Sequence, residues 1–231
     1  SASLVGSEMC IRDRCGTLIA LVLTIPSAYA LSRPQFAPRK VFNGLIMFTM
    51  LFSGGMIPSY IVVTRLGLAN KLPALFLPMA CSAYNLIITK NFMTSLPVSL
   101  EESARIDGAS DITIFFKIVF PLSKPIMAVM ALFYGVGIYN DYFNSVLYIS
   151  SRELYPLQML LREMIVANTM QSSMIGLGNL TNKSEIFKMA TVVISIVPIL
   201  CVYPFLQKYF VKGLMPVSYT HLRAHETSAH L

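Results

Sequence analysis

Charged residues are scarce in this chain. Only 13% of the 231 residues are Asp, Glu, Lys or Arg, whereas 55% are hydrophobic and the mean hydropathy is +0.64. A soluble domain usually carries about 25% charged residues. The deficit argues against a soluble protein and indicates a chain embedded in lipid, where this length accommodates roughly five or six spans of ~20 residues.

Residues for metal and catalytic chemistry are missing from useful positions. The four Cys form no CxxC pair, and all three His lie within residues 221–231. The chain has no GxxxxGK[ST] phosphate loop, and its apolar segments hold no acid pair or nucleophile with a base. We therefore expect no disulfide framework, no metal or cofactor site and no enzymatic activity, and the chain is not itself an ATPase.

The net charge of +7 has two interpretations. Nucleic-acid binding would need a basic stripe, but the Lys and Arg residues stand singly or in pairs beside apolar runs. That placement is typical of the cytoplasmic flanks of membrane spans, and we favour it.

The two ends of the chain differ from its interior. Residues 1–14 and 216–231 are polar and lack periodicity. We interpret both as non-native sequence of the kind that translated adaptor DNA adds, and we place one membrane domain over residues 15–215. Two genuine disordered tails are the alternative.

Five apolar segments dominate the interior, and such density favours membrane spans over buried helices of a soluble core. The first is short for a span. The second contains Gly54, Gly55 and Pro58, which suit helix packing and bending or a kink that lines a pathway. The segments cover about Gly16–Leu31, Phe42–Thr64, Leu72–Thr89, Pro125–Ile149 and Ile186–Leu206. We thus expect an all-α polytopic membrane protein.

The loops between these segments differ in basic residues, which set the orientation of membrane proteins. One side carries nine: Arg33, Arg39, Lys40, Lys90, Arg105, Lys117, Lys124, Lys208 and Lys212. The other carries six: Arg65, Lys71, Arg152, Arg162, Lys183 and Lys188. This bias predicts that the loop 90–124 lies in the cytoplasm.

That loop predicts two short helices joined by a glycine turn. Ser99 and Glu102 have the spacing of a capping box, so a helix should begin at about Leu100. Gly108 suits the left-handed position after a helix end, and Ser110 can cap a second helix. Exposed apolar side chains on such a projection mark an interaction site, and the candidates are Ile106, Ile112, Phe115 and Phe116.

The same loop resembles the signature of permease subunits in binding-protein-dependent ABC importers. That signature has Glu-Ala-Ala, three residues, Gly, nine residues and Ile-x-Leu-Pro. This chain has Glu102-Ser103-Ala104, Gly108 and Ile118-Val119-Phe120-Pro121, departing only at Ser103 and Phe120. The residues flanking Gly108 and Pro121 look like the carbohydrate (maltose-type) branch. The alternative is an ordinary helical hairpin between two spans.

The resemblance implies a type I importer permease of six spans, of which five are visible here. Its loop, about residues 97–121, would dock on an ATPase subunit that binds the ATP. We transfer this role to Glu102, Ser103, Ala104, Asp107, Gly108, Ala109, Ile118 and Pro121. The implied partners are a second permease, two cytoplasmic ATPase subunits and an extracytoplasmic sugar-binding protein, in a bacterial inner membrane. A permease for amino acids, peptides or ions and an ion-driven secondary transporter are the alternatives.

Polar residues interrupt the fourth apolar segment. A charged side chain inside a bilayer is costly, so it should face a cavity or a partner. Asn and Asp can bind sugar hydroxyls and Tyr can stack on a sugar ring, so a candidate substrate path contains Tyr139, Asn140, Asp141 and Asn144. The alternative places them at the outer interface, within the aromatic belt.

Overall fold

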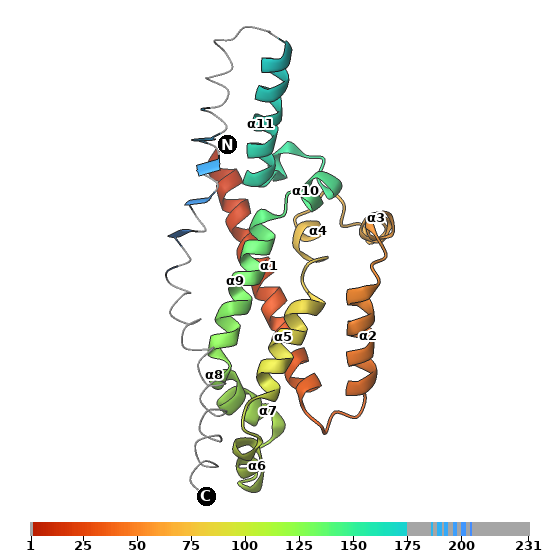
Figure 1. Cartoon of the computed structure of the whole chain (residues 1–231), viewed down its shortest axis with the longest axis vertical. Coiled ribbons are helices and arrows are strands. Elements are labelled where there is room, and N and C mark those ends of the chain that lie inside the picture. The colour runs from red at the N-terminus through yellow and green to blue at the C-terminus, as the bar shows by residue number, and fades with distance from the viewer. Residues whose placement is uncertain are drawn as a thin grey trace, which may run out of the picture.

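The computed structural model describes the backbone of residues 2–174 and isolated positions between residues 186 and 204. Throughout these residues the regular elements are helices, with no strand (Figure 1), which confirms the all-α prediction. The fifth predicted segment falls mostly outside the described residues, and its described positions are helical.

Helix α1 (Ala2–Ser32) is the axis of the molecule. Its stretch Ile11–Ser32 is the one helix in the described part that is by itself long and apolar enough to cross a membrane. The first span is therefore longer than the short segment expected from Gly16. Helices α5 (Ala83–Thr94) and α9 (Lys124–Asn140) pack along α1 (Figure 1).

The core lies where these three helices meet. One cluster joins α1 to α5 through Ile25, Ala28, Leu86 and Met93, and Met93 is completely buried. A second cluster joins α1 to α9 through Ala20, Ile126, Met130 and Tyr134. Apolar burial of this kind holds the three helices as one body.

The second apolar segment is a bent pair. Helix α2 (Arg39–Leu51) and helix α3 (Met56–Arg65) meet at 117°, and Gly55 between them has a φ of +82°. A glycine adopts this left-handed conformation without strain. The bend expected from the glycines of this segment is therefore confirmed.

The third segment is also broken, and here the prediction of one continuous span was wrong. Helix α4 (Pro73–Phe76) stops within a turn, and α5 starts afresh at Ala83. Ser82 caps α5, because its side chain accepts a hydrogen bond from the backbone N–H of Asn85. This local capping and Pro78 favour a break that average hydropathy does not reveal.

Helices α10 (Phe143–Tyr148) and α11 (Leu157–Met174) lie at the opposite end of the molecule from the loop 90–124 (Figure 1). They follow α9, which ends at Asn140. A single 3₁₀ turn, Arg152–Leu154, connects them.

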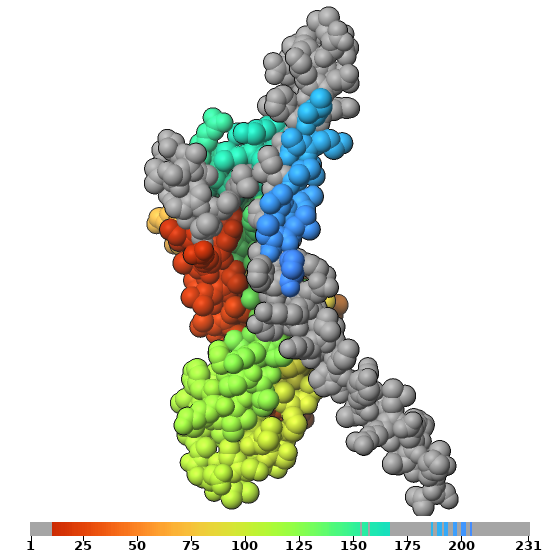
Figure 2. Space-filling model, turned by 90° about the vertical axis from the view of Figure 1, so that its left-hand side faces the viewer, coloured from red at the N-terminus to blue at the C-terminus, as the bar shows by residue number. Residues whose placement is uncertain are grey.

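Between α5 and α9 lies a compact helical projection, which we call the elbow (residues 97–121). It contains helix α6 (Val98–Ile106), helix α7 (Asp111–Ile114), a π-helical turn (Phe115–Val119) and the start of helix α8 (Phe120–Leu122). The segment from α7 to α8 meets α9 at 76°. In Figure 2 the elbow is the yellow-green lobe at the lower end of the molecule.

Candidate functional site: the helical elbow

The first helix of the elbow begins earlier than the sequence predicts. Pro97 is the N-cap of α6, and no side chain caps the helix. Ser99 therefore lies inside the first turn and is exposed, so the predicted capping box with Glu102 was wrong. The backbone of Pro97, with φ −59° and ψ 118°, already suits entry into a helix, and this displaces the start from Leu100 to Val98.

The turn after α6 has the predicted glycine geometry. Gly108 has a φ of +82°. Its N–H donates to the carbonyl of Arg105 at 3.0 Å, and the N–H of Ala109 donates to the carbonyl of Ala104 at 2.9 Å. These two bonds form a Schellman motif, in which the left-handed residue satisfies carbonyls that the helix end leaves open.

The second helix of the elbow is capped as predicted. The side chain of Ser110 accepts a hydrogen bond from the N–H of Thr113 at 3.3 Å, and Asp111 occupies the first turn. The Arg105 guanidinium contacts Asp111 at 2.9 Å across the turn, but the carboxylate is largely exposed. Such an exposed ion pair contributes little stability, so the glycine and the cap define this turn.

The structure brings six of the eight predicted coupling residues together. Glu102, Ser103 and Ala104 lie on α6, and Asp107, Gly108 and Ala109 form the turn that ends it. Ile118 lies on the π-helical turn and Pro121 on α8, beyond α7. All of these are exposed or half-buried: Glu102, Ser103, Asp107, Gly108 and Pro121 are exposed, and Ala104, Ala109 and Ile118 are half-buried.

The elbow also exposes large apolar side chains, as expected. Ile106 is 87% exposed, Ile112 71% and Phe116 61%. Phe115 differs, because its ring turns inward to Tyr29 of α1 at a centroid distance of 5.1 Å. These three outward side chains give the elbow an exposed apolar surface, a feature that is common at interaction sites.

Sequence reasoning missed the contact that anchors α6. Glu101 is buried and forms an ion pair with Arg33, which follows the end of α1. Arg33 also donates to the carbonyl of Met93 on α5 at 3.2 Å. The sequence offered only a first-turn acid and a basic loop residue, and no spacing rule connects residues so far apart.

The candidate substrate path lies at the other end of the molecule. Tyr139 and Asn140 end α9, and Asp141 is its C-cap, two residues before α10 begins. The Asp141 carboxylate accepts hydrogen bonds from the backbone N–H of Asn144 at 3.2 Å and from its Nδ2 at 2.8 Å. These contacts give Asp141 and Asn144 a local role in ending one helix and starting the next.

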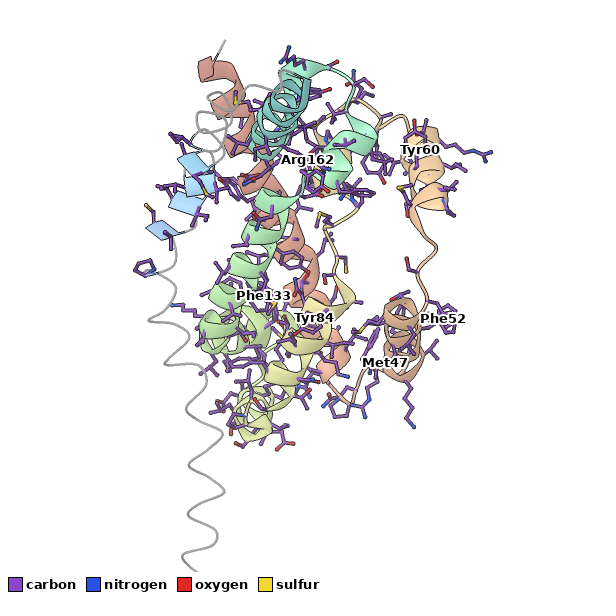
Figure 3. The ribbon with its side chains drawn as sticks, turned by 45° about the horizontal axis from the view of Figure 1, so that its top comes forward. Met47, Phe52, Tyr60, Tyr84, Phe133 and Arg162 are labelled. Carbon is purple, nitrogen blue, oxygen red and sulfur yellow. The ribbon has the colours of Figure 1, made fainter. Side chains whose placement is uncertain are left out.

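A cavity of about 610 Å³ adjoins this helix break. Its lining includes Tyr142, directly before α10, and Arg162 of α11, which is labelled in Figure 3. The Arg162 guanidinium lies 4.2 Å from the centre of the Tyr142 ring. The four predicted path residues are not among those lining it. Within the described residues no group of three His, Cys, Asp or Glu side chains is placed to hold a metal ion.

Residues 16–216 match the family model of the inner membrane component of binding-protein-dependent transport systems. The chain belongs to this family. It is therefore a membrane component of a transport system, as the signature around Gly108 predicted, and its relatives are named as transport permeases and not as enzymes.

Three similar proteins illustrate the relationship. Protein LplC of Bacillus subtilis is 48% identical over 201 residues, which cover 87% of this chain and 68% of LplC. The polygalacturonan/rhamnogalacturonan transport system permease YtcP of the same organism is 46% identical, over 87% of this chain and 71% of YtcP. A solved bacterial ABC transporter that imports the acidic polysaccharide alginate contains a chain with a TM-score of 0.77 and 34% identity, over 88% of this chain and 73% of that one.

Proposed function

We propose that this chain is a permease subunit of an ATP-driven importer for a sugar or oligosaccharide, and that its elbow docks on a separate ATPase. The observation that carries the proposal is the elbow itself. It combines a glycine turn with exposed Ile106, Ile112 and Phe116 at the end of the molecule that carries the basic loop after α1.

A docking role explains why the elbow is built from well-capped turns. The Schellman motif at Gly108 and the cap at Ser110 fix the angle between α6 and α7. A part that must be pushed by a partner has to move as one piece. The exposed apolar side chains then supply the area that a partner surface would bury.

The carbohydrate assignment rests on the relatives. Named permeases for polygalacturonan and rhamnogalacturonan, for arabinooligosaccharides and for galactooligosaccharides all match most of this chain. The candidate path residues Tyr139, Asn140, Asp141 and Asn144 supply groups that bind hydroxyls. We place these residues on the outer side of a bacterial cytoplasmic membrane that the protein crosses several times.

The family supports a proposal for the rest of the assembly. We propose a second permease subunit, two cytoplasmic ATPase subunits that bind the ATP, and an extracytoplasmic sugar-binding protein. Apolar side chains on α2 and directly after it support a membrane partner, because Met47 is 60% exposed and Phe52, the C-cap of α2, is 64% exposed (Figure 3). Lipid and the second permease together would cover such a surface.

A photo-cross-linking experiment tests the docking role. A photoreactive amino acid replaces Ile106 in the elbow of the assembled importer, and a matched variant carries it at Ile57 of α3, which is 68% exposed at the other end. We expect cross-links to the ATPase from position 106 and none from position 57. Equal labelling from both positions, or none from position 106, would contradict the proposal.

Transport in proteoliposomes tests the class of substrate and the energy source. We expect uptake of an oligosaccharide from a panel that also holds amino acids, peptides and ions, and we expect it to require ATP. Uptake that survives ATP removal but collapses with the ion gradient would indicate a secondary transporter instead.

A further inference from the structure

Helix α6 is attached to the body of the permease through very little surface. Of its nine residues, Glu101 is the only buried one, at 4% exposed. The helix packs mainly against α7, its neighbour in the elbow. A helix that exposes its large apolar side chains, Val98, Leu100 and Ile106, and buries one carboxylate is not held by hydrophobic packing.

The buried carboxylate contacts the end of α1 directly and α5 through Arg33. Glu101 pairs with Arg33, whose guanidinium also donates to the Met93 carbonyl in the last turn of α5. The hydroxyl of Tyr29 on α1 donates to the other Glu101 oxygen at 3.4 Å, and the Arg33 guanidinium lies 5.1 Å from the centre of that tyrosine ring. One arginine therefore joins α6 to the ends of α1 and α5.

The buried ion pair of Arg33 and Glu101 is expected to contribute little net stability. Both side chains of the ion pair are at most 7% exposed, and in the described part of the chain the Arg33 Nε has no hydrogen-bond partner. Taking two charges out of water offsets most of their attraction, and well-packed apolar replacements are often equally stable. What the pair supplies is direction, because a guanidinium binds carboxylate and carbonyl at fixed angles.

We propose that Arg33 and Glu101 are positioning residues that transmit the displacement of α6 to α1 and α5. The inference rests on the proposed docking of the elbow on an ATPase. Movement of α6 pulls on Glu101, and the guanidinium carries the displacement to the end of α1 and to the last turn of α5. A second link, the contact of Phe115 with Tyr29, keeps α7 in register with α1 during this movement.

This role differs from that of the outward residues of α6. Glu102 is exposed on the same helix and belongs to the surface that meets the partner. Glu101 faces the permease itself. Changes at Glu102 should therefore weaken docking on the ATPase. Changes at Glu101 should leave docking intact but lower the amount of solute imported per ATP hydrolysed.

The test uses the assembled importer in proteoliposomes and measures uptake, ATP hydrolysis and the cross-link from position 106. The Arg33→Met/Glu101→Leu double variant removes both charges, so neither is left buried without a partner. We expect it to assemble and cross-link like the parent, but to import about tenfold less solute per ATP, the factor that one charged hydrogen bond contributes. Glu101→Gln should do the same, and Arg33→Lys should recover part of the coupling.

The control is Glu163→Gln, which removes one partner of the exposed Arg152–Glu163 contact at the other end and should leave the ratio unchanged. Parental coupling in the double variant and in Glu101→Gln would overturn the inference, as would failure of both to assemble, which would make the pair purely structural. Absence of the cross-link from position 106 in the parent would instead refute the docking proposal.

Discussion

The hydroxyl of Tyr134 on α9 lies 2.7 Å from the hydroxyl of Thr24 on α1, and both side chains are buried. The Tyr134 hydroxyl also accepts a hydrogen bond from the backbone N–H of Ser82 at 3.2 Å, where the chain breaks between α4 and α5. A broken helix in a bilayer must satisfy its free backbone groups from neighbouring helices. Tyr134 thus stabilises the break and ties three elements together.

Replacing Tyr134 with Phe should therefore destabilise the protein. The change removes only the hydroxyl and leaves the Ser82 N–H without its partner, which should cost about 1–2 kcal/mol. Thermal unfolding in detergent measures the loss. Tyr84→Phe is the matched control, because Tyr84 is 58% exposed on α5 and should tolerate the change. Equal unfolding temperatures for both variants would show that the hydroxyl is dispensable.

Gly16→Ala should also destabilise the fold, through packing. A Cβ at Gly16 would lie 2.8 Å from the Cβ of Phe76 and 2.9 Å from Cδ1 of Ile138, so α1 would have to move away from α4 and α9. Such overpacking costs typically about 1–3 kcal/mol. Gly137→Ala is the control, since its Cβ would meet nothing within 4 Å. Thermal unfolding again compares the two, and a stable Gly16→Ala would mean that the helices separate easily.

Ser110→Ala should loosen the second helix of the elbow. The change removes the cap on Thr113 and should cost about 1 kcal/mol. Ser99→Ala on α6 should have almost no effect, because Ser99 is exposed and caps nothing. Amide hydrogen exchange is measured at residues 111–114 for Ser110→Ala and at residues 98–102 for Ser99→Ala. Faster exchange of residues 98–102 in Ser99→Ala would restore the capping box that the sequence suggested.

Gly108→Val should uncouple ATP hydrolysis from transport. The site has open space around it, but its φ of +82° strains any residue with a Cβ, and a β-branched one most. We expect a cost of about 1–3 kcal/mol that changes the angle between α6 and α7. The measurement is solute imported per ATP. Gly44→Val on α2, also in open space but without the left-handed backbone, should keep parental coupling.

The sequence predicted the features of this protein that depend on local chemistry. Glycine favours the left-handed backbone and serine favours the N-cap, so the residue types at Gly108 and Ser110 were enough to predict the turn and the second cap. The start of α6 was not, because the backbone of Pro97 takes the place of the capping side chain. The break between α4 and α5 was missed because hydropathy is averaged over a window of neighbouring residues. It carries no information on the distant Tyr134 hydroxyl, which accepts the hydrogen bond from the backbone N–H of Ser82.

The contact of Arg33 with Glu101 could not be predicted from any local sequence pattern. Both residues looked like ordinary loop charges, and only the packing of α1 beside α5 places them together. The eight coupling residues and the four path residues remain predictions in their roles, although the structure gives their positions.

The exposure of α6 has a consequence for engineering. Because six of its nine side chains are exposed, these six can be rewritten with little effect on folding. A library of α6 surfaces on an otherwise unchanged permease would allow selection for recognition of a foreign motor. Energy sources and translocation pathways from unrelated importers could then be recombined at this one short helix.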